Sequence, residues 1–447
     1  MPTLLDDRSS AKSRWTIPGL RWWIVGLLFI ASVKNYVDRQ TLSILAPTIQ
    51  RVLRVDDTAY ARILNLFLIA YTISYLASGR ITDWLGTRLS MALFMGWWSL
   101  ASMLTAFARS AASLGCFRFM LGLGEAGNYT VAPKVVAEWF PPKERAVAMG
   151  MNTLGATIGA TIAPLLVVAI LHRYGWQAAF AVTGAVGFVW LLPWIWLYRR
   201  PREHPRLSGE EREIVLGEAE AAKVEEEPEV KEPELARWGS LLRRRDVWLL
   251  LVGRMLTDPV FYFFQFWFAK YLFSVRHVPQ SKLGITWVVF LAADVGSLGG
   301  GFLSGYLIQR GRTPAGGRVA AMFLCACLIP LAPLAAFAPS LAGCLAIAMV
   351  VVVAHMSWLV NISALVVDLI PKRVVATAFG LIAAGSTVGG IMMNSLVAKL
   401  VTRYSYTDWF VIMAFLHPVA WLILWGGRVH RPPHTPGLSA PDSERVM

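Results

Sequence analysis

Long apolar runs recur along the chain from Trp22 to Gly427, and short polar segments separate them. A run of about 20 residues, rising 1.5 Å per residue, is long enough to cross a hydrocarbon core of about 30 Å. Backbone groups in lipid must pair internally, and these runs lack the alternation of barrel strands, so they are predicted to be helices. The predicted spans are 22–45, 60–80, 87–108, 111–133, 146–171, 176–198, 247–273, 281–309, 318–338, 340–368, 374–401 and 407–427. The pattern therefore predicts an all-α integral membrane protein with twelve transmembrane helices.

The twelve runs form two sets of six, with a polar break between them. Residues 218–234 in this break are acidic and interrupted by prolines, which is typical of a solvated linker. Ser208 and Glu211 have the spacing of a capping box, so a surface helix is predicted to begin there. The predicted organisation is a cytoplasmic N-terminal tail (1–21), a six-helix bundle (22–198), a cytoplasmic linker (199–246), a second six-helix bundle (247–427) and a cytoplasmic C-terminal tail (428–447).

Composition and charge agree with a membrane protein. Of the 447 residues 56% are hydrophobic and 16% are charged, too few charges to cover soluble domains of this size. The net charge of +14 could indicate binding to nucleic acid. With the N-terminus in the cytoplasm, however, most Lys and Arg fall in cytoplasmic segments, which is the pattern of the positive-inside rule. Residues 2–21 are polar, so no cleavable signal peptide is expected. The four cysteines lie in apolar runs, so we expect no disulfide set, metal site or cofactor.

A short loop motif follows the second span. Gly79, Asp83, Gly86 and Arg88 combine glycines that allow tight turns with charges that hold a loop against helix ends. We expect Asp83 and Arg88 to act in gating at this loop. A degenerate copy after the eighth span comprises Gly305, Gln309, Gly311 and Arg312, which supports an internal repeat.

Ionisable residues occur inside the predicted spans, where each costs about 2.5–3.5 kcal/mol on insertion scales. Asp38 and Arg39 are adjacent in the first span, and Arg118 and Glu125 lie two turns apart in the fourth. We predict proton coupling at Asp38 and Glu125, with Arg118 as the counter-ion of one of them. Arg39 is predicted to bind a substrate carboxylate, because guanidinium offers a charged bidentate fork.

Other polar and aromatic residues in the spans are candidates for binding substrate hydroxyl groups or a sugar ring. Lys134 either adds positive potential to the site or extends to the cytoplasm. Arg254 and Asp258 are four residues apart and are expected to form an intrahelical pair, while titratable chemistry concentrates in the N-terminal half. The further substrate-binding candidates are Tyr36, Tyr71, Lys134, Asn152, Thr157, Gln265, Trp358 and Asn361.

With its loop motif and six-plus-six layout, the chain resembles the major facilitator superfamily. Within it, several stretches are similar to the anion:cation symporter branch and its bacterial hexuronate transporters. These stretches are NYVDRQ (35–40), RFMLGLGEAGN (118–128), AEWFPPKERA (137–146), PREHPRLS (201–208), TDP (257–259) and DLIPKR (368–373). The resemblance implies that Arg39 matches the carboxylate-binding Arg, Asp38 and Glu125 the proton-linked acids, and Arg118 their partner. It also implies two bundles that rock about a central site.

The resemblance implies proton-coupled symport of a hexuronate, such as glucuronate or galacturonate, across the bacterial inner membrane. The expected partners are a small anionic sugar acid, protons and membrane lipids, and a monomer is expected. Transport of another organic anion, an aldonate or an organophosphate, by symport or exchange stays open as an alternative. A membrane enzyme or sensor is the remote alternative, since the sequence has no Walker loop, metal-spaced His/Cys set or nucleophile elbow.

Overall fold

The computed structural model describes residues 16–216, 239–371 and 374–429. These residues form helices and connecting turns, with no strand among them. The acidic stretch 218–234, most of both predicted tails and the last two residues of DLIPKR lie outside the described residues. The elements are α1 (Leu20–Leu53), α2 (Asp57–Thr105), α3 (Ala111–Trp139), α4 (Pro142–Leu197), η1 (Pro201–Glu203), α7 (Arg245–Phe266), α8 (Phe268–Ser274), η2 (Gln280–Thr286), α9 (Trp287–Gln309), α10 (Pro314–Leu328), η3 (Ile329–Leu331), α11 (Ala332–Phe337), α12 (Leu341–Leu369), α13 (Val375–Arg403) and α14 (Tyr406–Gly426).

Two of these helices each contain two predicted spans. α2 is interrupted at Gly86, with φ 77°, and α4 at Gly175, with φ 85°. Positive φ at these values is accessible to glycine at little cost, so the chain reverses direction there. Gly86 belongs to the loop motif, and its conformation accounts for the glycine at that position.

Eight of the described helices are long and apolar enough to cross a membrane, and α2 and α4 are among them. α1 and α3 fall short of this hydropathy because they carry the ionisable residues singled out above. With α2 and α4 taken as two spans each, and α1 and α3 added, the described chain contains twelve membrane-crossing segments. The predicted all-α membrane architecture is confirmed.

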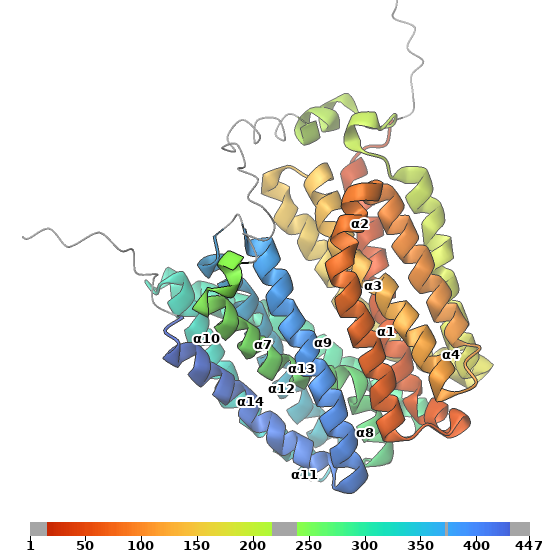
Figure 1. Ribbon diagram of the computed structural model, residues 1–447, viewed down its shortest axis with the longest axis vertical. Helices are drawn as coiled ribbons and strands as arrows, with labels where there is room; N and C mark the ends of the chain where they lie inside the picture. Colours follow the sequence, from red (N-terminus) through yellow and green to blue (C-terminus); the bar gives the residue numbers. More distant parts are fainter. Residues whose placement is uncertain (1–15, 217–238, 372–373, 430–447) are drawn as a thin grey trace, which may run out of the picture.

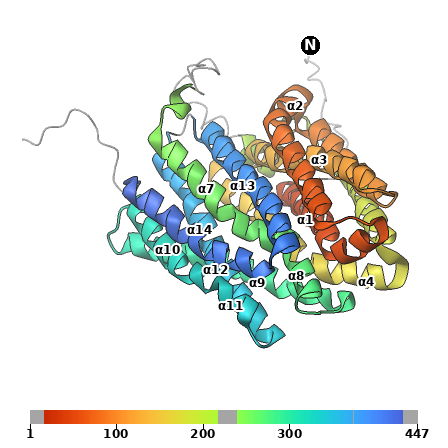
Figure 2. The same ribbon diagram turned by 60° about the horizontal axis from the view of Figure 1, so that its bottom comes forward.

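The helices form two bundles, which both views of the ribbon separate clearly (Figures 1 and 2). Helices α1–α4 form one bundle, and α7–α14 form the other. Glycines set the closest helix contacts in both: an added Cβ at Gly155 or Gly159 of α4 would overlap the α1 backbone. Gly385 and Gly389 of α13 meet α7 in the same way. Small residues that let backbones approach closely are the usual basis of helix association in lipid.

One end of the molecule carries the start of α1 and the connection between the bundles, and we call it the linker end. The carboxylate of Glu211 accepts hydrogen bonds from the backbone N–H groups of Leu20 and Arg21, both at 3.0 Å. Ser208 accepts from the N–H of Glu211 at 3.2 Å, as the predicted helix start requires. The segment that begins the linker is therefore docked onto the first helix.

The opposite end, which we call the far end, holds the bundles together. Lys270 of α8 forms an ion pair with Asp57 of α2. The Tyr60 hydroxyl donates to the carbonyl of Phe266 at 3.0 Å, and Thr48 Oγ1 donates to Gln280 Oε1 at 2.5 Å. Figure 1 shows the two bundles closest together at this end and diverging toward the linker end.

Candidate functional site

A cavity of about 250 Å³ lies between the two bundles, on the linker side of the far-end contacts. This volume is close to the lower limit for small-molecule sites. Tyrosines, hydroxyl groups and two arginines dominate its polar wall. The lining residues are Tyr36, Arg39, Tyr71, Thr72, Tyr75, Leu76, Tyr129, Arg254, Tyr262, Phe379, Gly380, Ala383, Ala384, Ser386 and Thr387.

Arg39 of α1 pairs with Glu125 of α3 at the cavity wall. Arg39 Nε and Nη2 both donate to Glu125 Oε2, at 3.1 and 2.9 Å, and Nη2 also donates to Asn35 Oδ1 at 3.4 Å. Glu125 is fully buried, and its Oε1 has no hydrogen-bond partner among the described residues. The pair therefore leaves one carboxylate oxygen unsatisfied in a buried position, which costs free energy.

Aromatic rings surround the Arg39 guanidinium. Its central carbon lies 5.0 Å from the ring centroids of Tyr36 and Tyr71 and 5.4 Å from that of Phe67. Cation–π contacts of this kind stabilise a desolvated cation and restrict its orientation. The predicted grouping of Arg39, Tyr36 and Tyr71 at one cavity wall is therefore present.

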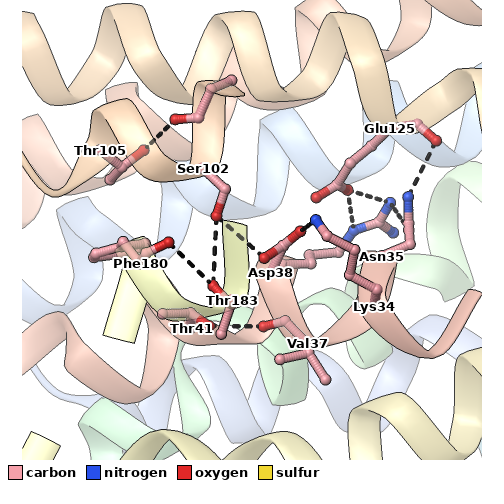
Figure 3. Close-up of polar contacts among 12 residues, drawn as sticks. Lys34, Asn35, Val37, Asp38, Thr41, Ser102, Thr105, Glu125, Phe180 and Thr183 are labelled. Carbon is pink, nitrogen blue, oxygen red and sulfur yellow. Dashed lines mark hydrogen bonds and ion pairs between the residues drawn. The ribbon is translucent and has the colours of Figure 1, made fainter. Parts of the chain in front are cut away.

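Asp38 is not among the residues that line the cavity, and its carboxylate points toward Lys34 and Ser102 within the N-terminal bundle (Figure 3). Its carboxylate forms an ion pair with Lys34, one turn earlier on α1, and accepts from Ser102 Oγ at 3.1 Å. Lys34 is 4% exposed, and its ammonium lies over the Trp98 ring. Sequence reasoning did not assign Lys34 this role, although its i, i+4 spacing to Asp38 is the usual signal.

Arg118 does not form the predicted ion pair with Asp38 or Glu125. Its Nη1 donates to the backbone carbonyl of Asp38 at 3.5 Å, and its Nε and Nη2 have no partner among the described residues. The reason is that Lys34 occupies the carboxylate of Asp38 and Arg39 occupies that of Glu125. Arg118 is thus a buried cation, 1% exposed, without a carboxylate partner in this conformation of the described chain.

The C-terminal bundle contributes its own charged residue to the cavity. Arg254 and Asp258 of α7 form the predicted intrahelical pair, with Nη2 and Oδ2 2.7 Å apart. Arg254 also lines the cavity together with Arg39. Arg254 brings a charged residue of the C-terminal bundle to the cavity, while the expectation that titratable chemistry concentrates in the N-terminal half stays a prediction.

Besides Lys134, five of the predicted substrate-binding residues are not part of the cavity wall. Asn152 accepts a hydrogen bond from Ser32 at 2.8 Å inside the N-terminal bundle, and Thr157 donates to Leu154 of its own helix. Asn361 donates to the carbonyl of Gly300 at 3.0 Å, which joins α12 to α9. Each of these side chains makes its hydrogen bonds within or between neighbouring helices, although Asn361 Oδ1 has no partner among the described residues.

The remaining two of these five are also packed elsewhere. Trp358 is fully buried with its ring centroid 5.1 Å from that of His417, so it is part of the C-terminal core. Gln265 is 3% exposed, and its backbone carbonyl accepts a hydrogen bond from Ser43 Oγ at 2.6 Å near the far end. The large apolar ring explains why Trp358 is buried in the core. The contact between the bundles explains why Gln265 is buried at the far end.

Lys134 extends to the loop motif instead of lining the cavity. Its ammonium lies 2.6 Å from Asp83 Oδ1, at the linker end. Arg88 donates to the carbonyl of Ile195 at 2.5 Å, and Thr87 donates to Glu138 at 2.8 Å. The motif therefore connects α2 with α3 and α4 at the linker end.

Several cavity residues were not predicted from the sequence. Tyr129 follows Glu125 by one helical turn, and this spacing could have indicated a shared face. Thr72 and Thr387, whose hydroxyls are 2.9 Å apart, meet across the bundles. Nothing in the local sequence signals a contact between residues so far apart in the chain.

Comparison with known proteins agrees with this architecture. Residues 28–392 match the family described as the Major Facilitator Superfamily. The chain is 34% identical to a galacturonate transporter of Dickeya chrysanthemi over 288 residues, which covers 64% of this chain and 82% of that protein. It is 29% identical to a hexuronate transporter of Escherichia coli (strain K12) over 419 residues, 92% of this chain and 94% of that one. A solved bacterial homologue of the human lysosomal transporter Spinster, inward-facing and occupied, superposes with a TM-score of 0.73 at 17% identity, covering 93% of this chain and 99% of that chain.

Proposed function

The chain belongs to the Major Facilitator Superfamily, and from this premise we propose that it imports a sugar acid, a hexuronate such as galacturonate or glucuronate, together with protons. The family and the relatives are transporters and not enzymes. The single observation that carries the proposal for this chain is the Arg39–Glu125 pair in the wall of a cavity between the bundles. The names of the relatives support the substrate class, and the cavity supplies a cation suited to a carboxylate.

We place the linker end in the cytoplasm of a bacterial inner membrane, with both termini inside. The distribution of Lys and Arg supports this orientation. The far end then faces outward, and its contacts close the outer side while the cavity lies on the cytoplasmic side. This arrangement corresponds to an inward-facing conformation of an alternating-access cycle.

Coupling follows from competition for Arg39. A substrate carboxylate that binds the Arg39 guanidinium displaces the carboxylate of Glu125, which already has one unpaired oxygen. An ionised Glu125 left alone in the membrane interior is costly, and binding a proton removes that cost. Substrate and proton therefore bind together. The positive charge of the proton offsets the negative charge of the substrate carboxylate, so the net charge of the site stays at zero.

Asp38 and Arg118 provide a second step in this proposal. The unpartnered N–H groups of Arg118 make it a ready partner for a carboxylate released nearby. When Asp38 is protonated, its ion pair with Lys34 is lost, and the backbone carbonyl of Asp38 still contacts Arg118. Protonation of Asp38 thus removes a charge pair within α1, the helix that carries Arg39, while the backbone contact between α1 and α3 is kept.

Exchange of organic anions without protons is the alternative, and two guanidinium groups in the cavity would suit an organophosphate. The buried carboxylates of Asp38 and Glu125 favour proton coupling, since an exchanger has no need of titratable acids in its bundle. The relatives reported above are transporters of sugar acids, which favours the hexuronate.

Uptake into proteoliposomes tests the proposal. An imposed gradient, acidic outside, is expected to drive concentrative uptake of galacturonate by the wild-type protein. Glu125→Gln is expected to lose this response to the gradient, because a glutamine cannot exchange a proton. Glu210→Gln, an exposed position outside the spans, is the matched control. Proton coupling is contradicted if the pH gradient does not change galacturonate uptake by the wild-type protein. It is also contradicted if the gradient still drives uptake by Glu125→Gln.

Substitution of the cation tests the substrate site separately. Arg39→Lys keeps the charge but loses the planar fork, so galacturonate affinity is expected to fall about ten- to hundredfold, in the range of one or two charge-assisted hydrogen bonds. Calorimetric titration of the purified protein measures this. Arg244→Lys, at an Arg–Asp pair outside the cavity, is the control. Unchanged affinity in Arg39→Lys removes Arg39 from the carboxylate-binding role.

A further inference from the structure

A cleft at the linker end of the N-terminal bundle gathers three arginines. It lies between the turn within α2 and the end of α4, has a volume of about 430 Å³, and is lined by Arg88, Arg199 and Arg200. Glu203 is the one carboxylate among its described lining residues. Three guanidinium groups against one carboxylate leave the wall with a net positive charge, and we call this site the arginine cleft.

Hydrogen bonds to the backbone hold the two walls of the arginine cleft together. Arg88 donates to the carbonyl of Ile195 at 2.5 Å, and Trp194 Nε1 donates to the carbonyl of Arg88 at 3.0 Å. Arg200 lies against the turn itself, since a Cβ added at Gly86 would lie 3.0 Å from its Nη2. The shape of the cleft is therefore part of the fold of this bundle.

Two cations of the arginine cleft differ from Arg21, which lies at the same end and pairs with Glu144 at 3.0 Å. Arg199 and Arg200 are exposed, and within the described part of the chain neither has an ion pair or a side-chain hydrogen bond. Solvation alone accounts for arginines that are scattered over a surface. Like charges that converge in one concave wall repel each other, and a bound anion removes that cost.

Apolar surface that faces the membrane adjoins the arginine cleft. Arg199 also lines a neighbouring hollow, together with Leu192, Ile195 and Trp196. Leu192 is 70% exposed and Trp196 56%, at the end of a membrane-crossing segment, and Arg206 lies over the Trp196 ring at 4.0 Å. Tryptophan at the end of a span is typical of the level of the lipid headgroups. The surface therefore places cations at headgroup level directly beside an apolar groove.

These features together match one kind of molecule, a phospholipid with a net negative charge. Guanidinium groups bind phosphate through bidentate, charge-assisted hydrogen bonds. Basic pockets at the ends of membrane helices suit acidic headgroups. Soluble phosphate would use the cations but leave the apolar hollow uncovered. A zwitterionic lipid would cover the hollow but leave the positive charge without compensation.

We propose that the arginine cleft binds the headgroup phosphate of an acidic phospholipid in the leaflet at the linker end, with an acyl chain along Leu192, Ile195 and Trp196. The proposal does not depend on the substrate or proton assignments, because none of these residues lines the cavity between the bundles. Arg88 belongs to the loop motif, so the bound lipid stabilises the junction of α2 with α4.

Native mass spectrometry of the purified full-length protein tests the proposal, by titration in detergent with phosphatidylglycerol or with phosphatidylcholine of the same acyl chains. The wild-type protein is expected to bind the first phosphatidylglycerol at least about tenfold more tightly. Arg199→Gln combined with Arg200→Gln is expected to weaken phosphatidylglycerol binding about ten- to thirtyfold, the range for two basic residues at an acidic membrane surface. Binding of phosphatidylcholine is expected to stay within about threefold.

Arg243→Gln combined with Arg245→Gln is the matched control, because it removes the same charge from exposed positions at the same end. This variant is expected to keep the preference for phosphatidylglycerol. Equal affinity of the wild-type protein for the two lipids overturns the proposal. Equal losses in the two double variants also overturn it, since they would assign the effect to general electrostatics.

Glycerol 3-phosphate separates the lipid from a soluble phosphate, because it carries the phosphate without acyl chains. At the same concentration it is expected to leave phosphatidylglycerol bound, and displacement overturns the assignment to a lipid. If the Arg199→Gln, Arg200→Gln variant does not fold, Arg199→Gln alone replaces it, with an expected weakening of about fivefold.

Discussion

At the scale of single residues, the described structure assigns most of the charges inside the membrane to pairs. Lys34 pairs with Asp38, Arg39 with Glu125, and Arg254 with Asp258. Arg118 stands apart, because its contacts are a backbone carbonyl and the Phe67 ring. Replacing one member of a buried pair leaves an uncompensated charge, which costs far more than replacing both members.

The Lys34–Asp38 pair gives a prediction at this scale. Lys34→Gln is expected to lower stability by about 3–5 kcal/mol while Asp38 is ionised, because it leaves a buried carboxylate without its cation. Lys34→Gln combined with Asp38→Asn is expected to recover most of the loss. Thermal melting in detergent at neutral pH measures both variants.

The Asp38→Asn single variant completes a double-mutant cycle with these two. A double variant no more stable than Lys34→Gln alone would show that the two side chains do not depend on each other. The ion pair would then contribute nothing specific to the N-terminal bundle.

At the scale of helices, glycines determine how closely each bundle packs. Gly122 and Gly124 bring α3 against α2, and Gly155 and Gly159 bring α4 against α1. None of these positions has room for a Cβ, so glycine is what allows these close helix contacts. α1 carries Arg39 and α3 carries Glu125, so these contacts also determine the geometry of the site.

Gly159→Ala is the prediction that belongs to this scale. Its Cβ would overlap the carbonyl oxygen of Val33 on α1, so α1 and α4 must separate. A loss of about 1–3 kcal/mol is expected, the usual cost of overpacking. Gly150→Ala in the same helix is the matched control, because nothing lies within 4 Å of its Cβ position. Thermal melting of both variants gives the comparison, and equal melting temperatures would contradict close packing at Gly159.

At the scale of the whole molecule, the two bundles meet at the far end around a cavity that lies toward the linker end (Figure 1). The Lys270–Asp57 ion pair and the hydrogen bonds of Tyr60 and Thr48 must break for the far end to open. These contacts therefore influence the balance between the two states of the proposed transport cycle.

Lys270→Gln is expected to shift that balance toward the state with the far end open. Each 1.4 kcal/mol of lost interaction changes the population ratio about tenfold. A cysteine at Thr48, in a background with Cys116 and Cys327 replaced by serine, reports the change through its rate of labelling by an impermeant maleimide. The rate is expected to rise several-fold in Lys270→Gln.

Lys282→Gln is the control for this measurement, because it removes an exposed positive charge near the same end. An unchanged labelling rate in Lys270→Gln would show that the ion pair does not hold the far end closed. Equal acceleration by both substitutions would assign the effect to general electrostatics.

The sequence by itself determined that this is a helical membrane protein of the Major Facilitator Superfamily, with a glycine-containing loop motif and with acids and arginines in its spans. Hydropathy, glycine spacing and charge are properties of the chain, and lipid makes their structural consequences strict. The sequence also identified Arg39, Tyr36 and Tyr71 as candidates, and all three line the cavity because they lie near one another on α1 and α2.

The tertiary structure alone decided that Arg39, and not Arg118, meets Glu125, and which residues face the cavity. Each residue turns a helix by about 100°, so a small error in rotation moves a side chain from the cavity to the core. Trp358, Asn361 and Asn152 were misplaced for that reason. The contact of Thr72 with Thr387, and the placement of Arg254 opposite Arg39, arise when two separate bundles pack together, and no local pattern in either bundle encodes that packing.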